Sequence, residues 1–307
     1  MVGEKKISIA IATYNGEKYL SKLLDSLFEQ TVLPDEIIVS DDCSTDSTVQ
    51  ILQHYSNRHP FIKVICNERN IGVNKNFETA VLNCTGDYIL VCDQDDVWLE
   101  NNIETKILLL EKMPLNEPNL VTSGAVLADK NLSPIRNISL TSDVTDWKEL
   151  FFRCFQGTTM AFNKHLLKLC NKWPASFSNV PYDYYIYCVA LLSGNVYASS
   201  KPLMYYRSHE GNVSFRSGKI KNCLKRVFPT YRLTEIRMSY KGLMEMKYAF
   251  DSLPFAEIKQ DRLVFFNELI LCARKGGIAY LKFINLSEIS FFMKVKVVVG
   301  SLVSHIK

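Results

Sequence analysis

The sequence predicts an α/β fold with a mostly parallel sheet flanked by helices, followed by a mainly helical C-terminal region. First, short apolar runs alternate with helical patterns over the first 110 residues. Second, these runs are continuously apolar, which is typical of strands buried on both faces of a parallel sheet. Third, residues 201–307 carry 19 Lys and Arg against 8 Asp and Glu, whereas residues 1–200 carry 17 against 24. An acidic α/β region thus precedes a basic one.

The elements of the first 110 residues follow from local patterns. Four apolar runs are predicted strands: KISIAIATY (6–14), EIIVS (36–40), IKVIC (62–66) and YILVC (88–92). Three segments between them are predicted helices: 17–30, the later part of 41–52, and 72–84. The turn pair Asn15–Gly16 ends the first strand, and Ser44, Thr45 or Asp46 caps the second helix.

The pattern is less regular beyond residue 120. Three segments are predicted strands: LVTSGAVLA (120–128), GTTMAF (157–162) and NVYASSKPLMYY (195–206). DYYIYCVALL (183–192) is a predicted helix, and residues 216–307 are basic and mainly helical. From composition we expect a domain of residues 1–215 and a second region of residues 216–307.

The nine cysteines are scattered and odd in number, without a C-x-x-C pair or histidines at zinc-finger spacing. We therefore expect them to be small buried hydrophobic residues in a reducing cytosol.

Polar clusters follow three of the predicted strands, at residues 13–15, 41–46 and 93–96. In a parallel sheet the carboxyl ends of the strands meet at one edge, where ligands bind. Carboxylates gathered there repel one another, and a divalent cation with substrate phosphates is the usual way to offset the repulsion. The alternative is that Asp is common in solvated turns. Three clusters in register favour a ligand site.

These motifs resemble family 2 glycosyltransferases of the GT-A fold. The resemblance covers residues 5–215 and rests on ISIAIATYNGEKYL, EIIVSDDCSTDST, NIGVNKNFETAV, GDYILVCDQDDVW, PYDYYIYCVALLSG and LMYYRSHEGN. The DQDDVW and Y-R-x-H-x-x-N motifs are most similar to those of bacterial rhamnosyltransferase-like members of the family. The family implies an inverting transfer of a sugar from a nucleoside diphosphate.

The resemblance implies a role for each matching position. Asp41 would accept the N3–H of uracil or thymine, and the other residues implied on the nucleotide-sugar side are Thr13, Tyr14, Asn15, Asp42, Asp93 and Arg207. Mg2+ or Mn2+ would be held by Asp95, Asp96 and His209. Asp183 would be the general base, although Tyr182 replaces the Glu that many members have before it.

Some candidates have equally simple structural explanations. Asp183 is also placed to cap the helix that follows it, and His209 is also explained as a plain loop histidine. On the acceptor side we expect Gln156, Gly157 and Thr158, because glycine permits close approach of a ligand or backbone. Trp98 is a further acceptor-side candidate, with a core position as its alternative.

The basic region has nine Lys and Arg between Arg216 and Lys247, against Glu235 and Glu245, with aromatic and aliphatic residues interleaved. This pattern suits an anionic membrane surface. The alternatives are a helical bundle packed on the catalytic domain, or a homodimer interface. Nucleic acid is a poor partner, because residues 1–200 are acidic overall and contain no recognisable nucleic-acid-binding module.

The resemblance implies transfer from dTDP-L-rhamnose, or from a UDP-hexose, to a hydroxyl of a lipid-linked or polysaccharide acceptor. The resemblance and the basic region together place this reaction in the cytoplasm, at the inner face of a bacterial membrane, in O-antigen or related surface-glycan synthesis. A catalytically silent, sugar-nucleotide-binding homologue is one alternative. A haloacid-dehalogenase-type phosphohydrolase is another, since DQDDV fits its nucleophile motif. A dinucleotide-binding oxidoreductase is excluded by the lack of G-x-G-x-x-G after the first strand.

Overall fold

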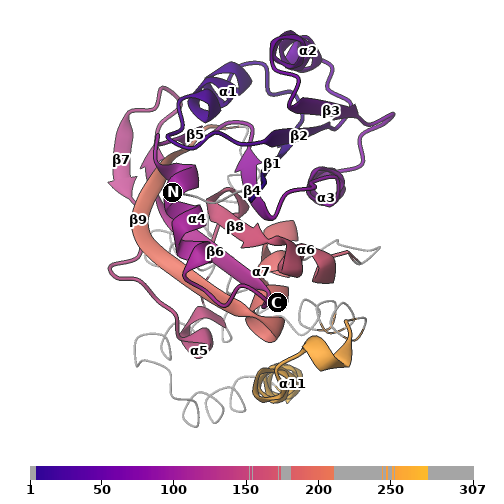
Figure 1. The fold of residues 1–307 in the computed structure, drawn as a ribbon, viewed down its shortest axis with the longest axis vertical. Helices are drawn as coiled ribbons and strands as arrows, with labels where there is room; N and C mark the ends of the chain where they lie inside the picture. Colours follow the sequence, from indigo (N-terminus) through magenta and orange to yellow (C-terminus); the bar gives the residue numbers. More distant parts are fainter. Residues whose placement is uncertain are drawn as a thin grey trace. The chain divides into compact units, whose positions relative to one another are not determined.

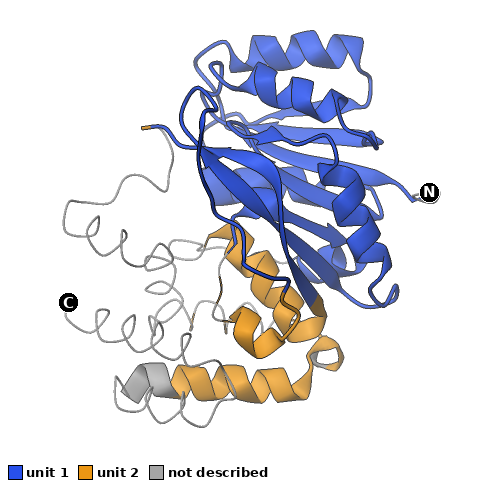
Figure 2. Ribbon diagram, turned by 90° about the vertical axis from the view of Figure 1, so that its left-hand side faces the viewer, with its two compact units in different colours: residues 1–143, 155–171, 196–209 blue, residues 144–154, 172–195, 210–307 orange. Residues whose placement is uncertain are grey.

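The computed structural model describes residues 5–151, 153, 155–171, 173, 181–210, 244, 247, 251 and 253–275. The chain divides into two compact units (Figure 2). The first contains Met1–Asp143, Phe155–Asn171 and Val196–His209, and the second contains Val144–Cys154, Lys172–Asn195 and Glu210–Lys307. The expected domain boundary after residue 215 falls outside the described residues and stays a prediction.

The sheet of the first unit begins with four parallel strands in the order β3-β2-β1-β4. They are β1 (Ile7–Thr13), β2 (Glu36–Asp41), β3 (Ile62–Cys66) and β4 (Tyr88–Asp93), as the continuous apolar runs predict. Every residue of β1 and β2 is buried. Strands covered on both faces are apolar throughout, which explains why the sequence signal was strong here.

The sheet continues beyond β4 through β8, β6, β9 and β5, and β7 pairs with β6. These strands are β5 (Val97–Trp98), β6 (Asn119–Ala128), β7 (Pro134–Asn137), β8 (Met160–Asn163) and β9 (Asn195–Arg207). The pairs β4–β8, β8–β6, β6–β7 and β9–β5 are antiparallel, so the sheet is mixed. The predicted strand at 157–162 begins later, because Gly157–Thr159 form a turn of 3-10 helix (η1).

Helices cover both faces of the parallel strands (Figure 1). The helices of this unit are α1 (Leu20–Phe28), α2 (Thr48–Arg58), α3 (Val73–Leu82), α4 (Asn102–Glu111) and α6 (Lys164–Leu169). In β1, Ile7, Ile9 and Ile11 share a hydrophobic cluster with residues of α1, α2 and α4. The opposite face of β1 and β2 packs against α3. The helix α2 starts at Thr48 with Ser47 as its N-cap, which corrects the expected caps.

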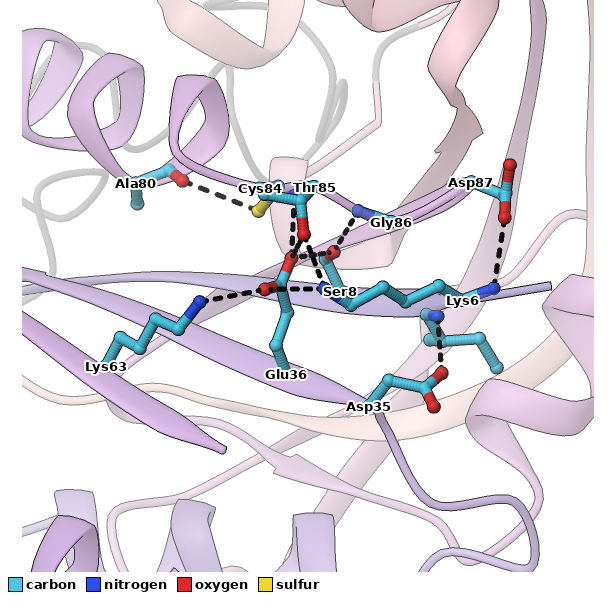
Figure 3. Close-up of polar contacts among 11 residues, drawn as sticks. Lys6, Ser8, Asp35, Glu36, Lys63, Ala80, Cys84, Thr85, Gly86 and Asp87 are labelled. Carbon is cyan, nitrogen blue, oxygen red and sulfur yellow. Dashed lines mark hydrogen bonds and ion pairs between the residues drawn. The ribbon is translucent and has the colours of Figure 1, made fainter. Parts of the chain in front are cut away.

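A polar network closes the amino ends of these strands around the buried carboxylate of Glu36 (Figure 3). Glu36 accepts hydrogen bonds from the hydroxyls of Ser8 (2.6 Å) and Thr85 (2.9 Å) and from the Thr85 amide (2.6 Å). Lys6 and Lys63 form ion pairs with it at 3.1 and 3.5 Å. All acceptor positions of this buried charge are therefore satisfied, as a buried carboxylate requires.

The second unit contains α5 (Trp147–Phe151), α7 (Tyr182–Ser193), a short 3-10 helix η3 (Phe255–Glu257) and α11 (Gln260–Lys275). Nearly all of α7 is buried, in agreement with its apolar sequence. The Arg262 guanidinium of α11 donates to the carbonyls of Leu191 (2.5 Å) and Gly194 (2.6 Å), at the end of α7. The guanidinium thus donates to carbonyls that have no hydrogen-bond partner within the helix.

Two other expectations are tested in part by the described residues. Cys84, Cys92, Cys170 and Cys188 are buried free thiols as expected, but Cys43 and Cys66 are exposed. In the part of the chain that the structure describes, no helix has the length and apolar character needed to cross a bilayer. Apart from Met244 and Lys247, the basic segment from Arg216 to Lys247 lies outside the described residues.

Candidate active site

The three polar clusters meet at the carboxyl edge of the parallel strands, as the sequence predicts. Thr13, the last residue of β1, is paired in register with Asp41, the last residue of β2. On the other side of β1, Ala12 is paired with Asp93, the last residue of β4. The loops that follow these strands therefore leave from adjacent positions on the sheet, where α/β proteins bind their ligands.

Asp41 is held by its neighbours at the end of β2. Its Oδ1 accepts hydrogen bonds from the hydroxyls of Thr13 (2.8 Å) and Ser44 (2.6 Å), and its Oδ2 accepts one from the Ser44 amide (2.9 Å). The side chain is fully buried. Its role in binding the base stays a prediction.

Tyr14 and Asn15 lie in the loop after β1 and are exposed. Asn15 has a left-handed backbone with φ of 49° and joins this loop to the one after β2. Its amide donates to the Ser44 hydroxyl (2.9 Å), and its Oδ1 accepts from the Thr45 amide (2.8 Å). The exposed Tyr14 ring, 47% accessible, is available to a ligand.

Asp42 occupies a different position from its neighbour Asp41. Its two carboxylate oxygens accept hydrogen bonds from the amides of Ile71 (2.7 Å) and Gly72 (2.9 Å), and Asn67 adds a longer bond of 3.3 Å. The side chain is buried and anchors the loop before α3. The structure thus gives Asp42 a local role, and its predicted contact with the nucleotide sugar stays untested.

Three carboxylates gather after β4, and Asp96 is the most deeply buried of them. Its exposed fraction is 0%, and its Oδ1 accepts a hydrogen bond from the Arg207 amide at 3.0 Å. Burial raises the pKa of Asp96 well above its ordinary value, and the neighbouring Asp95 and Asp93 carboxylates raise it further. The bonds from Arg207 and Thr158 act in the opposite direction. This repulsion is what a bound cation would relieve.

The end of β9 brings Arg207 and His209 to the same carboxylates. The Arg207 guanidinium is buried, and its Nε donates to the Asp95 carbonyl at 2.6 Å. His209 Nε2 lies 2.7 Å from Asp95 Oδ2. Tyr19, just before α1, packs against both: its ring centroid lies 4.7 Å from Arg207 Cζ and 4.6 Å from the His209 ring. Residues more than 100 positions apart in the sequence thus form one cluster.

Two of the three predicted metal ligands, Asp95 and Asp96, carry the carboxylate oxygens that hard divalent cations prefer, whereas His209 offers an imidazole nitrogen. Asp95 and His209 are already in contact, and the buried, charge-repelled Asp96 lies in the same loop. Among the described residues, no group of three or more Asp, Glu, His or Cys side chains is arranged so that it could hold a metal ion, so the structure does not bring Asp95, Asp96 and His209 together as one ligand set, and their metal-binding role stays a prediction. Mg2+ commonly binds through one or two carboxylates together with substrate phosphates, so a complete protein cage is not required.

The acceptor-side candidates divide into two groups. Thr158 is buried beside the acidic loop, and its hydroxyl accepts a hydrogen bond from the Asp93 amide at 3.4 Å; Gln156 and Gly157 precede it in the chain. Trp98 lies in the hydrophobic core with only 3% of its surface exposed. Its ring faces the ammonium of Lys106, 5.1 Å away, so it does not offer a platform to a sugar.

Asp183 lies in the second unit, in the first turn of α7. It is partly buried, and its Oδ1 accepts a hydrogen bond from the amide of the next residue, Tyr184, at 2.7 Å. The N-cap of α7 is Pro181 rather than Asp183. Asp183 is therefore not the N-cap residue, but its carboxylate does accept one of the first-turn amides of α7, as the capping alternative expects, and its role as general base stays a prediction.

Sequence reasoning missed Gln94 and Tyr19. The Gln94 side-chain amide makes two hydrogen bonds with the backbone of Tyr14, at 2.9 and 3.0 Å. Its position between Asp93 and Asp95 was the available signal, but an uncharged side chain in an acidic cluster does not indicate which backbone groups it bonds to. Tyr19 falls within the predicted helix 17–30, and nothing local in the sequence indicates that Arg207 and His209 lie against it.

The comparisons with known proteins agree with this arrangement. The model of the family described as Glycosyl transferase family 2 matches residues 8–166, more than half of the chain. The dTDP-rhamnosyl transferase RfbG of Shigella flexneri is 29% identical over 227 residues, which cover 67% of this chain and 76% of RfbG. The poly(ribitol-phosphate) beta-N-acetylglucosaminyltransferase TarS of Staphylococcus aureus is 40% identical over 94 residues, 30% of this chain and 16% of TarS.

A crystal structure of S. aureus TarS 1-349 in complex with UDP-GlcNAc has a similar fold. The TM-score is 0.63 at 19% identity, with 97% of this chain and 90% of that chain covered. This likeness confirms the predicted α/β fold with flanking helices. Since the family model covers more than half of the sequence and the fold agrees with it, the chain belongs to glycosyltransferase family 2.

Proposed function

We propose that the chain is an inverting, metal-dependent glycosyltransferase that moves L-rhamnose from dTDP-L-rhamnose to a saccharide hydroxyl. The observation that carries this proposal is the meeting of Asp41, Asp93, Asp95, Arg207 and His209 at one edge of the sheet. The groups that we assign to the nucleotide and to the cation are thus adjacent in a member of a glycosyltransferase family. The choice of rhamnose is supported by the likeness to RfbG.

The proposal is less specific about the nucleobase of the donor than about the site that binds it. Asp41 would accept the N3–H of the base, and uracil and thymine offer this donor equally. A UDP-hexose is therefore the alternative donor, and the relative TarS, crystallised with UDP-GlcNAc, supports it. Tyr14, exposed in the loop after β1, would pack against the nucleoside.

Charge on the leaving diphosphate is the main chemical difficulty of the reaction. A bound Mg2+ or Mn2+ ion would supply electrostatic stabilisation of that charge. Asp95, Asp96 and His209 would hold the ion. The buried Arg207 guanidinium, held by the Asp95 carbonyl, would add a fixed positive charge on the same side of the donor.

A sugar hydroxyl is a weak nucleophile, so a base that removes its proton in the transition state accelerates the transfer. We assign this role to Asp183. With a base and no enzyme nucleophile, one displacement occurs and the anomeric configuration inverts. Gln156, Gly157 and Thr158 would lie on the acceptor side.

The acceptor is proposed to be a lipid-linked saccharide or a growing polysaccharide at the cytoplasmic face of a bacterial membrane. The basic segment from Arg216 to Lys247 supports this location, because each basic residue near an anionic surface contributes about 1 kcal/mol. Docking on the catalytic domain or formation of a homodimer is the alternative use of this segment.

The test is a thermal-shift series with nucleotides and nucleotide sugars, each with and without Mn2+ or Mg2+. A ligand at a hundredfold excess over its Kd stabilises the native state by about 2.7 kcal/mol. We expect metal-dependent stabilisation, larger for dTDP and dTDP-rhamnose than for UDP sugars. Stronger stabilisation by UDP or UDP sugars would contradict dTDP-L-rhamnose as the donor, but it would remain consistent with the proposed metal-dependent transfer.

A catalytically silent homologue is the second candidate function. It would bind a nucleotide sugar and show no transfer with any acceptor. The absence of stabilisation by every nucleotide would contradict both candidates. The phosphohydrolase alternative is not retained, because the DQDDV motif follows β4 rather than the first strand and the chain belongs to another family.

A further inference from the structure

The Gln94 side chain connects the loop after β4 to the loop after β1. Its Oε1 accepts a hydrogen bond from the Tyr14 amide at 2.9 Å, and its Nε2 donates to the Tyr14 carbonyl at 3.0 Å. Both backbone polar groups of Tyr14 therefore bond to one side chain, in the manner of a neighbouring strand. Two bonds to one planar amide define both the separation and the orientation of the two loops.

Gly16 leaves the space that this side chain needs. A Cβ added to Gly16 would lie 2.3 Å from Gln94 Oε1 and 2.7 Å from its Cδ. Gly16 is itself held, because its amide donates to the Thr48 hydroxyl at 2.8 Å. Any side chain at this position would therefore displace the Gln94 amide rather than the loop.

The loop that carries Tyr14 is also held from the opposite side. Asn15 bonds to Ser44 and Thr45 in the loop after β2. Tyr14 and Asn15 thus lie between the Asp41 side of the site and the Asp93–Asp96 side, and Gln94 makes the connection to the latter. These are the two halves that a nucleoside diphosphate and its cation would span.

We propose that Gln94 is a positioning residue that sets the distance between the nucleoside side and the diphosphate side of the donor site. This inference rests on the proposed nucleotide-sugar function. Nucleotide binding and cation binding are then coupled through these loops: the cation strengthens nucleotide binding only while the loops after β1 and β4 keep their spacing. Loss of the Gln94 amide should therefore weaken binding of the nucleotide–metal pair more than binding of the nucleotide alone.

The experiment measures the Kd of dTDP and of UDP, with and without Mn2+, for the full chain by titration calorimetry. Gln94→Met keeps the length of the side chain but neither hydrogen bond, and Gln94→Ala removes the side chain. We expect the Kd measured with Mn2+ to rise about tenfold, which corresponds to 1.4 kcal/mol. We expect a smaller rise without Mn2+ and an unchanged melting temperature without ligand.

Gly16→Ala disrupts the hydrogen bonds between Gln94 and Tyr14 in a second way. Its Cβ displaces the Gln94 amide, so this variant should weaken binding as Gln94→Ala does, and the double variant should be no worse than either single one. Gln53→Ala, an exposed glutamine on α2, is the matched control and should bind as wild type does.

Each outcome is decisive. Equal loss with and without Mn2+, additive losses in the double variant, or wild-type affinity in a folded Gln94→Met would overturn the positioning role alone. Wild-type chain that binds neither nucleotide would overturn the proposed donor site and this inference together.

Discussion

Among single residues, Lys106 has the least favourable environment for its charge. It is fully buried on α4, and its Nζ has no hydrogen-bond partner among the described residues. Its ammonium lies over the face of the Trp98 ring, 5.1 Å from the ring centroid. Burial lowers its pKa from 10.5 to about 7, so folding releases a proton that the unfolded chain holds. Lys106 therefore destabilises the fold wherever the unfolded lysine is charged.

Lys106→Met should raise the free energy of unfolding by a few kcal/mol near neutral pH. Between the folded pKa of about 7 and the unfolded value of 10.5, the unfolded state binds more protons, so wild-type stability rises with pH. The advantage of the variant should therefore shrink as the pH approaches 10.5. Urea unfolding across this pH range measures it. Lys112→Met, an exposed lysine at the end of the same helix, should show no such gain; an equal gain would contradict the explanation.

Tyr19 is the second residue with a testable contribution, because its ring touches both Arg207 and His209. Tyr19→Ala should lower kcat/KM for the donor about tenfold, since a desolvated cation–π contact contributes about 1–2 kcal/mol and orients the cation. Tyr19→Phe keeps the ring and should retain most of the activity. Steady-state kinetics with the donor identified by thermal shift measures both. Full activity in Tyr19→Ala would exclude this role.

At the scale of elements, the two ends of the parallel strands are built differently. At the amino ends, the Glu36 carboxylate is enclosed by hydroxyl, amide and ammonium donors (Figure 3). Burial tends to raise its pKa, but the bonds from Ser8, Thr85 and Lys6 outweigh this and lower it to about 2. At the carboxyl ends, Asp96 has its pKa raised by burial and by neighbouring carboxylates. The carboxylate at the amino ends is stabilised in its charged form, whereas Asp96 at the carboxyl ends is destabilised in its charged form.

Glu36→Gln should reduce the free energy of unfolding by about 3 kcal/mol near neutral pH, the equivalent of lowering the pKa from 4.5 to about 2. A depressed carboxyl pKa stabilises the fold above pH 4.5, and this contribution is lost as the pH falls toward 2. The difference between variant and wild type should therefore vanish in acid. Denaturant unfolding across this range tests it, with Glu29→Gln as the exposed control. A pH-independent difference would exclude the charge of Glu36 as the cause.

At the scale of the whole molecule, the proposed site residues belong to two compact units. The strand-end carboxylates, Arg207 and His209 belong to the first unit, whereas Asp183 belongs to the second. Binding of the donor and removal of the acceptor proton are thus assigned to separate parts of the chain. Separate variants can therefore test them.

Asp183→Asn should abolish transfer while it leaves nucleotide–metal binding intact. A general base contributes about 100-fold to 10,000-fold to a rate, and Asn cannot take up the proton. Product nucleotide released per minute measures transfer, and a thermal shift with dTDP and Mn2+ measures binding. Asp251→Asn, an exposed carboxylate of the same unit, should change neither. Near wild-type transfer in Asp183→Asn would show that the base lies elsewhere.

The local elements were predictable because their signals are local. Continuous apolar runs identified β1 to β4, and helical periodicity identified the helices between them. The two-residue strand β5 and the turn at Gly157–Thr159 were not found, since both depend on what packs beside them. Trp98 was a candidate for the acceptor side but lies in the core. The sequence could not decide between these two positions, because an aromatic residue after a strand is compatible with both.

By itself, the sequence determined the α/β class, the family and the meeting of three strand-end clusters at one edge, because parallel strands leave their carboxyl ends together. Only the tertiary structure decided which side chains complete the cluster. His209 meets Asp95 across 114 positions and the Arg207 amide meets Asp96 across 111, while Gln94 bonds to Tyr14 across 80. The reason is physical: periodicity reports which face of an element is buried, whereas contacts between distant segments depend on how the elements pack.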